Sequence, residues 1–284
     1  MPGNLGNASL LYGHNFFYLV ISVLVILGGI GFPILMNFRR LVSYYLRKSL
    51  QRGDLGQEYP RYIHLTNINT KIVLVTTSVL LGGGFLLTAL LEWNGAFAGM
   101  PIDEKLVQSF FTSVVPRTAG FNSVDLTHFS LLSITVYLFL MWIGGASQST
   151  AGGIKVNTFA VALANIRAVE SSVVLFHREI TPDSVSRASA VIFGSIVVIA
   201  FSFVVLVIME PELSPKGLLF EVVSAYSTVG ASLGVTPLLG GTSKLLIVVL
   251  MFVGRVGLIT VLMSLTRQRG ERKYRFPKGN VIIN

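Results

Sequence analysis

Two short strings hold the residue types best suited to a chemical task, and both contain the pattern Thr-x-Gly. They are Thr118-Ala119-Gly120-Phe121 and Thr228-Val229-Gly230-Ala231. A cation that enters a narrow filter loses its water shell, and backbone carbonyl oxygens can replace that shell. Glycine adopts the backbone angles that turn carbonyls toward one axis, and threonine adds a hydroxyl at the edge. Each string therefore predicts a filter that binds a cation.

A short apolar segment precedes each string, at residues 106–115 and 218–226. Both segments are too short to cross a bilayer, which takes about 20 apolar residues. We expect them to be re-entrant half-helices whose carboxyl ends, with about half a negative charge, point at the filter. This polarity favours cations over anions. Because lipid cannot satisfy the non-helical backbone that follows, the two loops predict a water-filled pathway.

A glycine-rich string follows the first filter and interrupts a long apolar run near its middle. We interpret it as a mobile loop below the filter that blocks the path when the protein is shut, since glycine and small polar residues give conformational freedom. The alternatives are a flexible kink packed against its neighbours and, with much weaker support from the pattern, a phosphate-binding loop. The predicted gate comprises Gly144, Gly145, Ala146, Ser147, Gln148, Ser149, Thr150, Ala151, Gly152, Gly153, Lys155 and Arg255.

Four charged residues lie within or beside these segments. Arg255 interrupts the last apolar run, where an isolated charge costs at least a few kcal/mol. We expect it to line the path and bond carbonyls of the glycine-rich string, the alternative being that it snorkels. Arg117 and Glu221 are expected to support the filters as a strut, with each other or with neighbouring carbonyls, the alternative being vestibule water. We expect the Lys155 side chain to bind lipid phosphate or a partner, or to be solvated.

Composition limits the class of protein. Of the 284 residues, 52% are hydrophobic and 12% are charged, whereas soluble domains carry about 25% charged residues. There is no cysteine and there are four scattered histidines, so the sequence offers no disulfides, no thiolate nucleophile and no convincing zinc site. The apolar runs contain no paired carboxylates and no nucleophile with a base. We therefore expect no enzyme and no cofactor on this chain.

Long apolar runs and the placement of positive charge predict an all-α integral membrane protein. Of the 22 Lys and Arg residues, 17 fall in alternate connections, which the positive-inside tendency places in the cytoplasm. The first residues are then outside and the basic tail inside. The net charge of +9 is thus explained by topology, so we expect membrane lipid and not nucleic acid as a partner. The five predicted spans are residues 16–36, 72–91, 126–154, 188–209 and 245–266.

The chain also contains an internal repeat. A shift of 110 residues superimposes the two Thr-x-Gly strings and places Met141-Trp142-Ile143-Gly144 on Met251-Phe252-Val253-Gly254 without a gap. Each unit is expected to be a helix, a pore loop and a helix. We divide the chain into 1–66, the closing helix of an incomplete repeat with a cytoplasmic loop, then 67–186, a repeat with a broken second helix, and 187–284, a further repeat with a basic cytoplasmic tail. The predicted fold is thus a pseudo-symmetric cation pore that is incomplete at its N-terminus.

These motifs carry a resemblance to a known family. Residues 115–122, the Gly/Ser/Thr string at 144–155, and residues 220–230 and 251–257 are similar to the Trk/Ktr/HKT potassium transporters, above all to the Ktr-type bacterial subunit. The resemblance implies four helix, pore-loop, helix units around one potassium path, of which this chain matches the latter half. It also places the family's gate at the glycine-rich string.

The same resemblance implies the setting in which the protein works. It implies potassium uptake across the bacterial plasma membrane, a homodimer of membrane subunits, and a cytoplasmic nucleotide-binding regulatory subunit of the RCK type. A second reading, from a different class, is a non-conducting structural half that needs a complementary half. Cation flux would separate the two.

Overall fold

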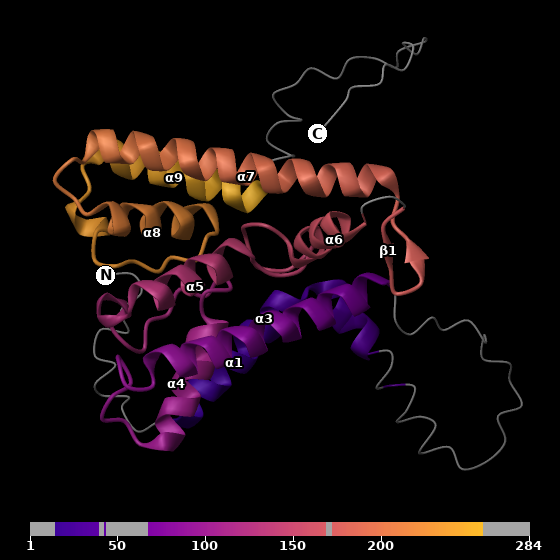
Figure 1. Cartoon of the computed structure of the whole chain (residues 1–284), viewed down its shortest axis with the longest axis horizontal. Helices are drawn as coiled ribbons and strands as arrows, with labels where there is room; N and C mark the ends of the chain where they lie inside the picture. Colours follow the sequence, from indigo (N-terminus) through magenta and orange to yellow (C-terminus); the bar gives the residue numbers. More distant parts are fainter. Residues whose placement is uncertain (1–14, 40–42, 44–67, 169–171, 258–284) are drawn as a thin grey trace, which may run out of the picture.

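The computed structural model describes residues 15–39, 43, 68–168 and 172–257 (Figure 1). Most of the predicted cytoplasmic loop after the first span, and all of the basic tail, lie outside these ranges. The described helices are α1 (Asn15–Ile30), α3 (Ile68–Glu92), α4 (Ile102–Val114), α5 (Leu131–Trp142), α6 (Val156–Arg167), α7 (Pro182–Met209), α8 (Pro215–Tyr226) and α9 (Gly241–Val256), with 3-10 turns η2 (Leu126–His128) and η3 (Thr236–Leu238).

Two helices of the described residues, α3 and α7, are long and apolar enough to cross a membrane, with mean hydropathies of 2.0 and 3.1. A third crossing results if α1 and the helix Phe32–Arg39 are one span bent by 100°. The bend falls at Gly31, whose φ is 94°. Within the described residues, helix length and composition thus support two or three of the five predicted spans. In the predicted span 126–154, the α-helix comprises only the 12 residues of α5, which follow η2. The predicted span 245–266 begins in α9, and its residues after 257 lie outside the described chain.

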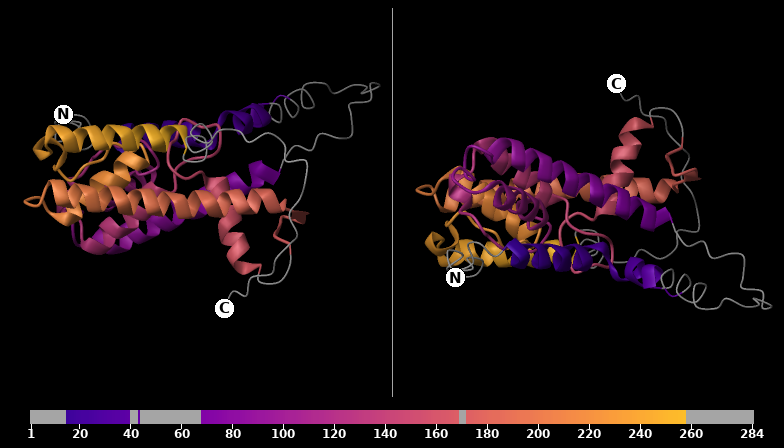
Figure 2. Two further views of the ribbon diagram at one scale, coloured as in Figure 1. Left: turned by 90° about the horizontal axis from the view of Figure 1, so that it is seen from above. Right: turned by 90° about the horizontal axis from the view of Figure 1, so that it is seen from below.

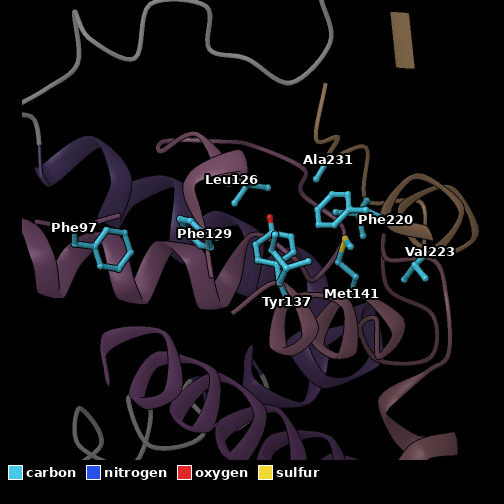
Figure 3. Close-up of a cluster of buried hydrophobic side chains, with 10 residues drawn as sticks. Phe97, Leu126, Phe129, Tyr137, Met141, Phe220, Val223 and Ala231 are labelled. Atoms are coloured by element: carbon cyan, nitrogen blue, oxygen red, sulfur yellow. The ribbon is translucent and has the colours of Figure 1, made fainter. Parts of the chain in front are cut away.

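The helices form two groups that meet at α5 and α8 and are also joined by α6, which packs on both α3 and α7 (Figures 1 and 2). In one group α7 packs on α8 and α8 on α9, and in the other α3 packs on α4 and α5, with α1 against α4. The core between the groups contains a stacked pair, Tyr137 of α5 and Phe220 of α8, whose ring centroids are 5.8 Å apart (Figure 3). Met141 and Val229 belong to the same core. Burial of such large side chains, at about 1.5–3 kcal/mol each, fixes α5 against α8.

The chain is not entirely helical, which corrects the all-α expectation in one place. Strands β1 (Val174–Leu175) and β2 (Arg178–Glu179) pair in antiparallel register. Phe176 and His177 connect them with φ values of 50° and 62°, and positive φ at both central residues is what a two-residue type I′ turn requires. No glycine marks this turn, so the sequence lacked the usual hairpin signal.

Each long helix ends in a carboxylate that caps a later helix. Glu92, at the end of α3, is 1% exposed and accepts a hydrogen bond from Ser130 N, at the start of α5, at 2.9 Å. Glu210, after α7, accepts from Gly240 N and from Ser243 Oγ, both at 2.7 Å, at the start of α9. Ser130 and Gly240 are related by the shift of 110 residues. A carboxylate satisfies helix N-terminal N–H groups and complements the helix dipole.

The cap formed by Glu210 predicts a pH-dependent stability. The hydrogen bond from Ser243, followed by that from Gly240 N, lowers the pKa of Glu210 below its usual range. A lowered pKa in the folded state adds stability above the unfolded pKa, about 4.3, and this stability is lost as pH falls through the folded pKa. Thermal unfolding of purified protein at pH 7 and pH 3.5 should therefore show a smaller acid shift for Glu210→Gln than for wild type. Glu212→Gln, an exposed carboxyl on the same turn, should behave as wild type, and an equal change in both variants would contradict the cap.

Candidate cation filter and gate

Both predicted half-helices are present as α4 and α8. α8 ends at Tyr226 as expected, α4 ends at Val114, one residue before the predicted end, and the helices begin three and four residues earlier than predicted. The start of α8 is explained locally, because Ser214 Oγ accepts from Gly217 N at 3.1 Å and Pro215 occupies the first helical position, where a missing N–H is tolerated. Both helices therefore direct their carboxyl ends at the Thr-x-Gly strings.

The two strings share an unusual backbone. Thr118 and Gly120 have φ values of 70° and 69°, and Thr228 and Gly230 have values of 54° and 84°. Left-handed φ is common only for glycine and costs roughly 1 kcal/mol or more elsewhere. Two threonines adopt it at matching positions, so the conformation is imposed by the surroundings in both loops. A single sequence pattern thus produces the same local geometry twice.

The strings also meet in space. A Cβ atom built on Gly120 would lie 2.0 Å from the carbonyl oxygen of Val229 and 3.2 Å from the carbonyl carbon of Gly230. Only a residue without a side chain permits this approach. The contact puts Gly120 and Gly230 side by side and not on opposite faces, as a shared pathway requires. Val229 is buried, whereas Phe121 is 38% exposed.

Hydrogen bonds from the half-helices hold the strings in place. In the first loop Gly120 N donates to Val115 O at 3.3 Å, and in the second Val229 N donates to Ser224 O at 2.9 Å. Ser224 Oγ also donates to Ala231 O at 2.6 Å. The Ala231 carbonyl is therefore turned toward α8, and this predicted filter residue acts as an anchor of the loop.

The bond from Ser224 gives a test of this anchoring. Ser224→Ala should lower the free energy of unfolding by about 1 kcal/mol, because a buried neutral hydrogen bond contributes about that much. Ser227→Ala is the matched control, since Ser227 is fully buried but its Oγ has no hydrogen-bond partner in the described part of the chain. Denaturant unfolding of both variants would contradict the anchor if Ser227→Ala were the more destabilised.

Buried oxygens without partners gather at the strings. Among the described residues, Ser227 Oγ, Thr228 Oγ1 and Asn122 Oδ1 are buried and accept or donate no hydrogen bond. Buried polar atoms are almost always partnered, so each such atom needs an explanation. Their position beside the two strings makes these oxygens candidate ligands for a cation or its remaining water.

The glycine-rich string is a folded loop directly beside the second filter. A Cβ on Gly152 would lie 2.1 Å from Thr228 Oγ1, and Gly153 N donates to Gly254 O at 3.3 Å. The loop also closes on itself, because Gly144 N donates to Ile154 O at 2.9 Å. The loop therefore lies against Thr228 of the second string, and its role as a gate stays a prediction. Its backbone is held by hydrogen bonds, which the sequence did not indicate.

The bend in α1 holds the other side of the loop. Ala146 N donates to Gly29 O at 2.8 Å, Thr150 N donates to Gly28 O at 3.3 Å, and Phe32 N donates to Gln148 O at 3.3 Å. The bend exposes these carbonyls and leaves the Phe32 N–H free to donate outside its own helix. The sequence gave no sign that the glycines of α1 dock the loop.

Two basic residues bond the loop. Arg255 Nη1 donates to Thr150 O, so Arg255 reaches the glycine-rich string as predicted. Lys155 Nζ donates to Ala151 O at 2.5 Å, a bond that the sequence did not indicate, and its contact with lipid phosphate, a partner or solvent stays a prediction. Both cations therefore bind carbonyls of the same short loop.

The predicted direct pair between Arg117 and Glu221 is not formed. Arg117 Nη2 donates to Gly144 O at 3.0 Å, and Glu221 Oε1 accepts from Thr236 Oγ1 at 2.5 Å. Arg117 lies in the chain after α4, whereas Glu221 lies within α8, and each side chain bonds a group other than the predicted partner. For Arg117 this is the second form of the prediction, a strut to a neighbouring carbonyl, and it ties the first filter to the gate. Thr236 is a site residue that sequence reasoning missed.

Comparisons with known proteins agree with this geometry. A family model described as TrkH, cation transport protein, matches residues 5–270. The potassium/sodium uptake protein NtpJ of Enterococcus hirae is 34% identical over 93% of this chain and 56% of its own length. The Ktr system potassium uptake protein B of Bacillus subtilis is 34% identical over the same shares. This chain spans about half the length of the curated relatives it matches.

A solved structure shows the same fold. The crystal structure of the potassium transporter TrkH from Vibrio parahaemolyticus matches with a TM-score of 0.68 and 17% identity, over 88% of this chain and 52% of that one. The family model covers nearly all of the chain, including both Thr-x-Gly strings and the glycine-rich loop. The chain therefore belongs to the TrkH family of cation transport proteins, a family of transporters and not of enzymes.

Proposed function

We propose that this chain forms part of a pathway for uptake of monovalent cations, K⁺ first among them, across the bacterial plasma membrane. The observation that carries the proposal is the meeting of the two filters, where Gly120 lies against Val229 with matching left-handed backbone in both strings. Buried oxygens without partners surround this point. The relatives' names, which specify potassium or sodium uptake, support the choice of ion.

In this proposal α3, α4 and α5 form one helix, half-helix, helix unit, and α7, α8 and α9 form another, arranged pseudo-symmetrically around one axis. The equivalent carboxylate caps at Ser130 and Gly240 support the equivalence. Positive charge in alternate connections supports entry of α4 and α8 from outside, with the tail in the cytoplasm.

The gate in this proposal is the glycine-rich loop with Arg255 and Lys155. Both cations lie beside the loop that abuts Thr228, where their charge repels a passing cation. Arg255 holds the closed loop through Thr150, and the bond between Arg117 and Gly144 couples that loop to the first filter.

Relatives are named as parts of Ktr systems, which supports a partner for this chain. We infer pairing of two copies in the lipid bilayer and a cytoplasmic nucleotide-binding subunit of the RCK type. Co-purification with such a subunit, lost when nucleotide is removed, would be the supporting result.

The function is tested in bacteria that lack their own potassium uptake systems. Cells that produce the chain should take up K⁺ or Rb⁺ tracer above the empty vector and grow at lower external K⁺. Purified protein in K⁺ should unfold at a higher temperature than in choline, because a ligand that binds the folded state stabilises it. A chain that inserts in the membrane but shows neither uptake nor stabilisation by K⁺ would overturn the proposal.

A further inference from the structure

In each half-helix, a buried acceptor side chain receives a hydrogen bond from a hydroxyl in the chain that follows the Thr-x-Gly string. In the first loop Ser123 Oγ donates to Gln108 Oε1 at 2.5 Å. In the second, Thr236 Oγ1 donates to Glu221 Oε1, also at 2.5 Å. The acceptors are 7% and 6% exposed. In both loops the acceptor stands on the half-helix and the hydroxyl stands after the filter.

The two bonds close loops of the same length. Gln108 and Ser123 are 15 positions apart, as are Glu221 and Thr236. Under the shift of 110 residues Gln108 falls on position 218, three residues before Glu221. The hydroxyl ends are displaced by the same three residues. Because residues three apart lie on one face of a helix, both acceptors occupy the same face of their half-helices, one turn apart.

From this match we infer that the pairs Gln108–Ser123 and Glu221–Thr236 are equivalent clamps that position the filters, and that they set the affinity for the transported cation. The inference rests on the proposed function and adds the residues that enforce the filter geometry. Each clamp fixes both ends of the loop that carries a Thr-x-Gly string. Without it, the left-handed threonine and glycine lose a restraint from the chain that follows the string and can relax toward ordinary backbone angles.

The acceptor's charge is not what the two clamps share, since one is an amide and the other a carboxylate. Their common property is an sp² oxygen that receives a hydroxyl proton. Variants that keep this oxygen should therefore behave as wild type, and variants that remove it should not. A clamp at Glu221 tolerates loss of the charge but not of the oxygen, whereas an electrostatic site requires the charge.

The experiment measures the K⁺ concentration that gives half of the maximal thermal stabilisation of the purified chain, with tracer uptake as a second readout. Glu221→Leu and Thr236→Val should each raise this concentration about tenfold, which corresponds to the loss of one buried hydrogen bond. Glu221→Gln, Gln108→Glu and Thr236→Ser should stay within about twofold of wild type. The double variant Glu221→Leu with Thr236→Val should raise the K⁺ concentration no further than either single change does, as expected for two partners in one bond.

Thr135→Val is the matched control for loss of a hydroxyl, because Thr135 Oγ1 donates to Leu131 O on the exposed face of α5. It should leave the K⁺ concentration unchanged. The inference is overturned if Glu221→Gln weakens K⁺ binding as much as Glu221→Leu does. It is also overturned if the clamp variants lower the unfolding temperature measured without K⁺ but leave the K⁺ concentration for half-maximal stabilisation unchanged. Absence of K⁺ stabilisation in the wild type would instead refute the proposed function, so the two failures are distinguishable.

Discussion

Replacing Gly120 with alanine is expected to reduce cation uptake by about tenfold to a hundredfold, because two effects add. The left-handed φ of 69° disfavours alanine by about 1 kcal/mol. The new Cβ would meet the Val229 carbonyl oxygen at 2.0 Å, and relief of such overpacking costs about 1–3 kcal/mol. The loops must separate, which moves the carbonyls that replace the ion's water. The measurement is Rb⁺ uptake per molecule of protein in the membrane.

Gly230→Ala is the control that isolates the steric part. Gly230 has a φ of 84°, but no atom lies within 4 Å of the position that an added methyl group would occupy. Uptake by Gly230→Ala should therefore fall only about threefold, because backbone strain is the only cost. Gly83→Ala, in α3 with open space around it, should be neutral. If Gly120→Ala and Gly230→Ala were equally impaired, contact between the filters would not be what limits uptake.

The filters and half-helices could be predicted because their signals are local. A Thr-x-Gly string after a short apolar segment specifies both a helix end and a backbone that needs glycine. The ends of α4 and α8 followed directly from the residues that precede Thr118 and Thr228. Their starts were missed by three or four residues, because α4 begins directly after Pro101 and α8 begins at Pro215, and both positions precede the apolar part of the helix.

Long-range pairings could not be predicted in the same way. The sequence placed Arg117 and Glu221 near the filters, but the partner of a buried charge depends on which carbonyl or hydroxyl the fold brings nearest. Composition also overestimated the length of the continuous helices, because an uninterrupted apolar run does not show where the backbone leaves the helical conformation. The bend at Gly31 occurs inside such a run, whereas the break after Trp142 was indicated by the glycine-rich string.

Loss of the contact between Arg255 and the glycine-rich loop is expected to increase cation uptake. The guanidinium of Arg255 donates to Thr150 O, and a hydrogen bond from a charged group contributes about 1.5–3 kcal/mol. If this bond exists only in the closed loop, its removal shifts the closed-to-open equilibrium by about tenfold to a hundredfold. Arg255→Gln should therefore raise Rb⁺ uptake at least about fivefold, measured at equal amounts of protein in the membrane.

Two variants separate the bond from the charge. Arg255→Lys keeps a cation at the same position, and Lys155→Gln removes the other cation, which bonds Ala151 O. If the closed state depends on the bond to Thr150, Arg255→Lys should retain part of the block and Lys155→Gln should raise uptake less than Arg255→Gln. Equal increases in Arg255→Gln and Lys155→Gln would mean that summed positive charge beside Thr228 limits the rate. Decreased uptake in Arg255→Gln would show that Arg255 supports the open pathway, because the bond to Thr150 would then hold the loop in its conducting form.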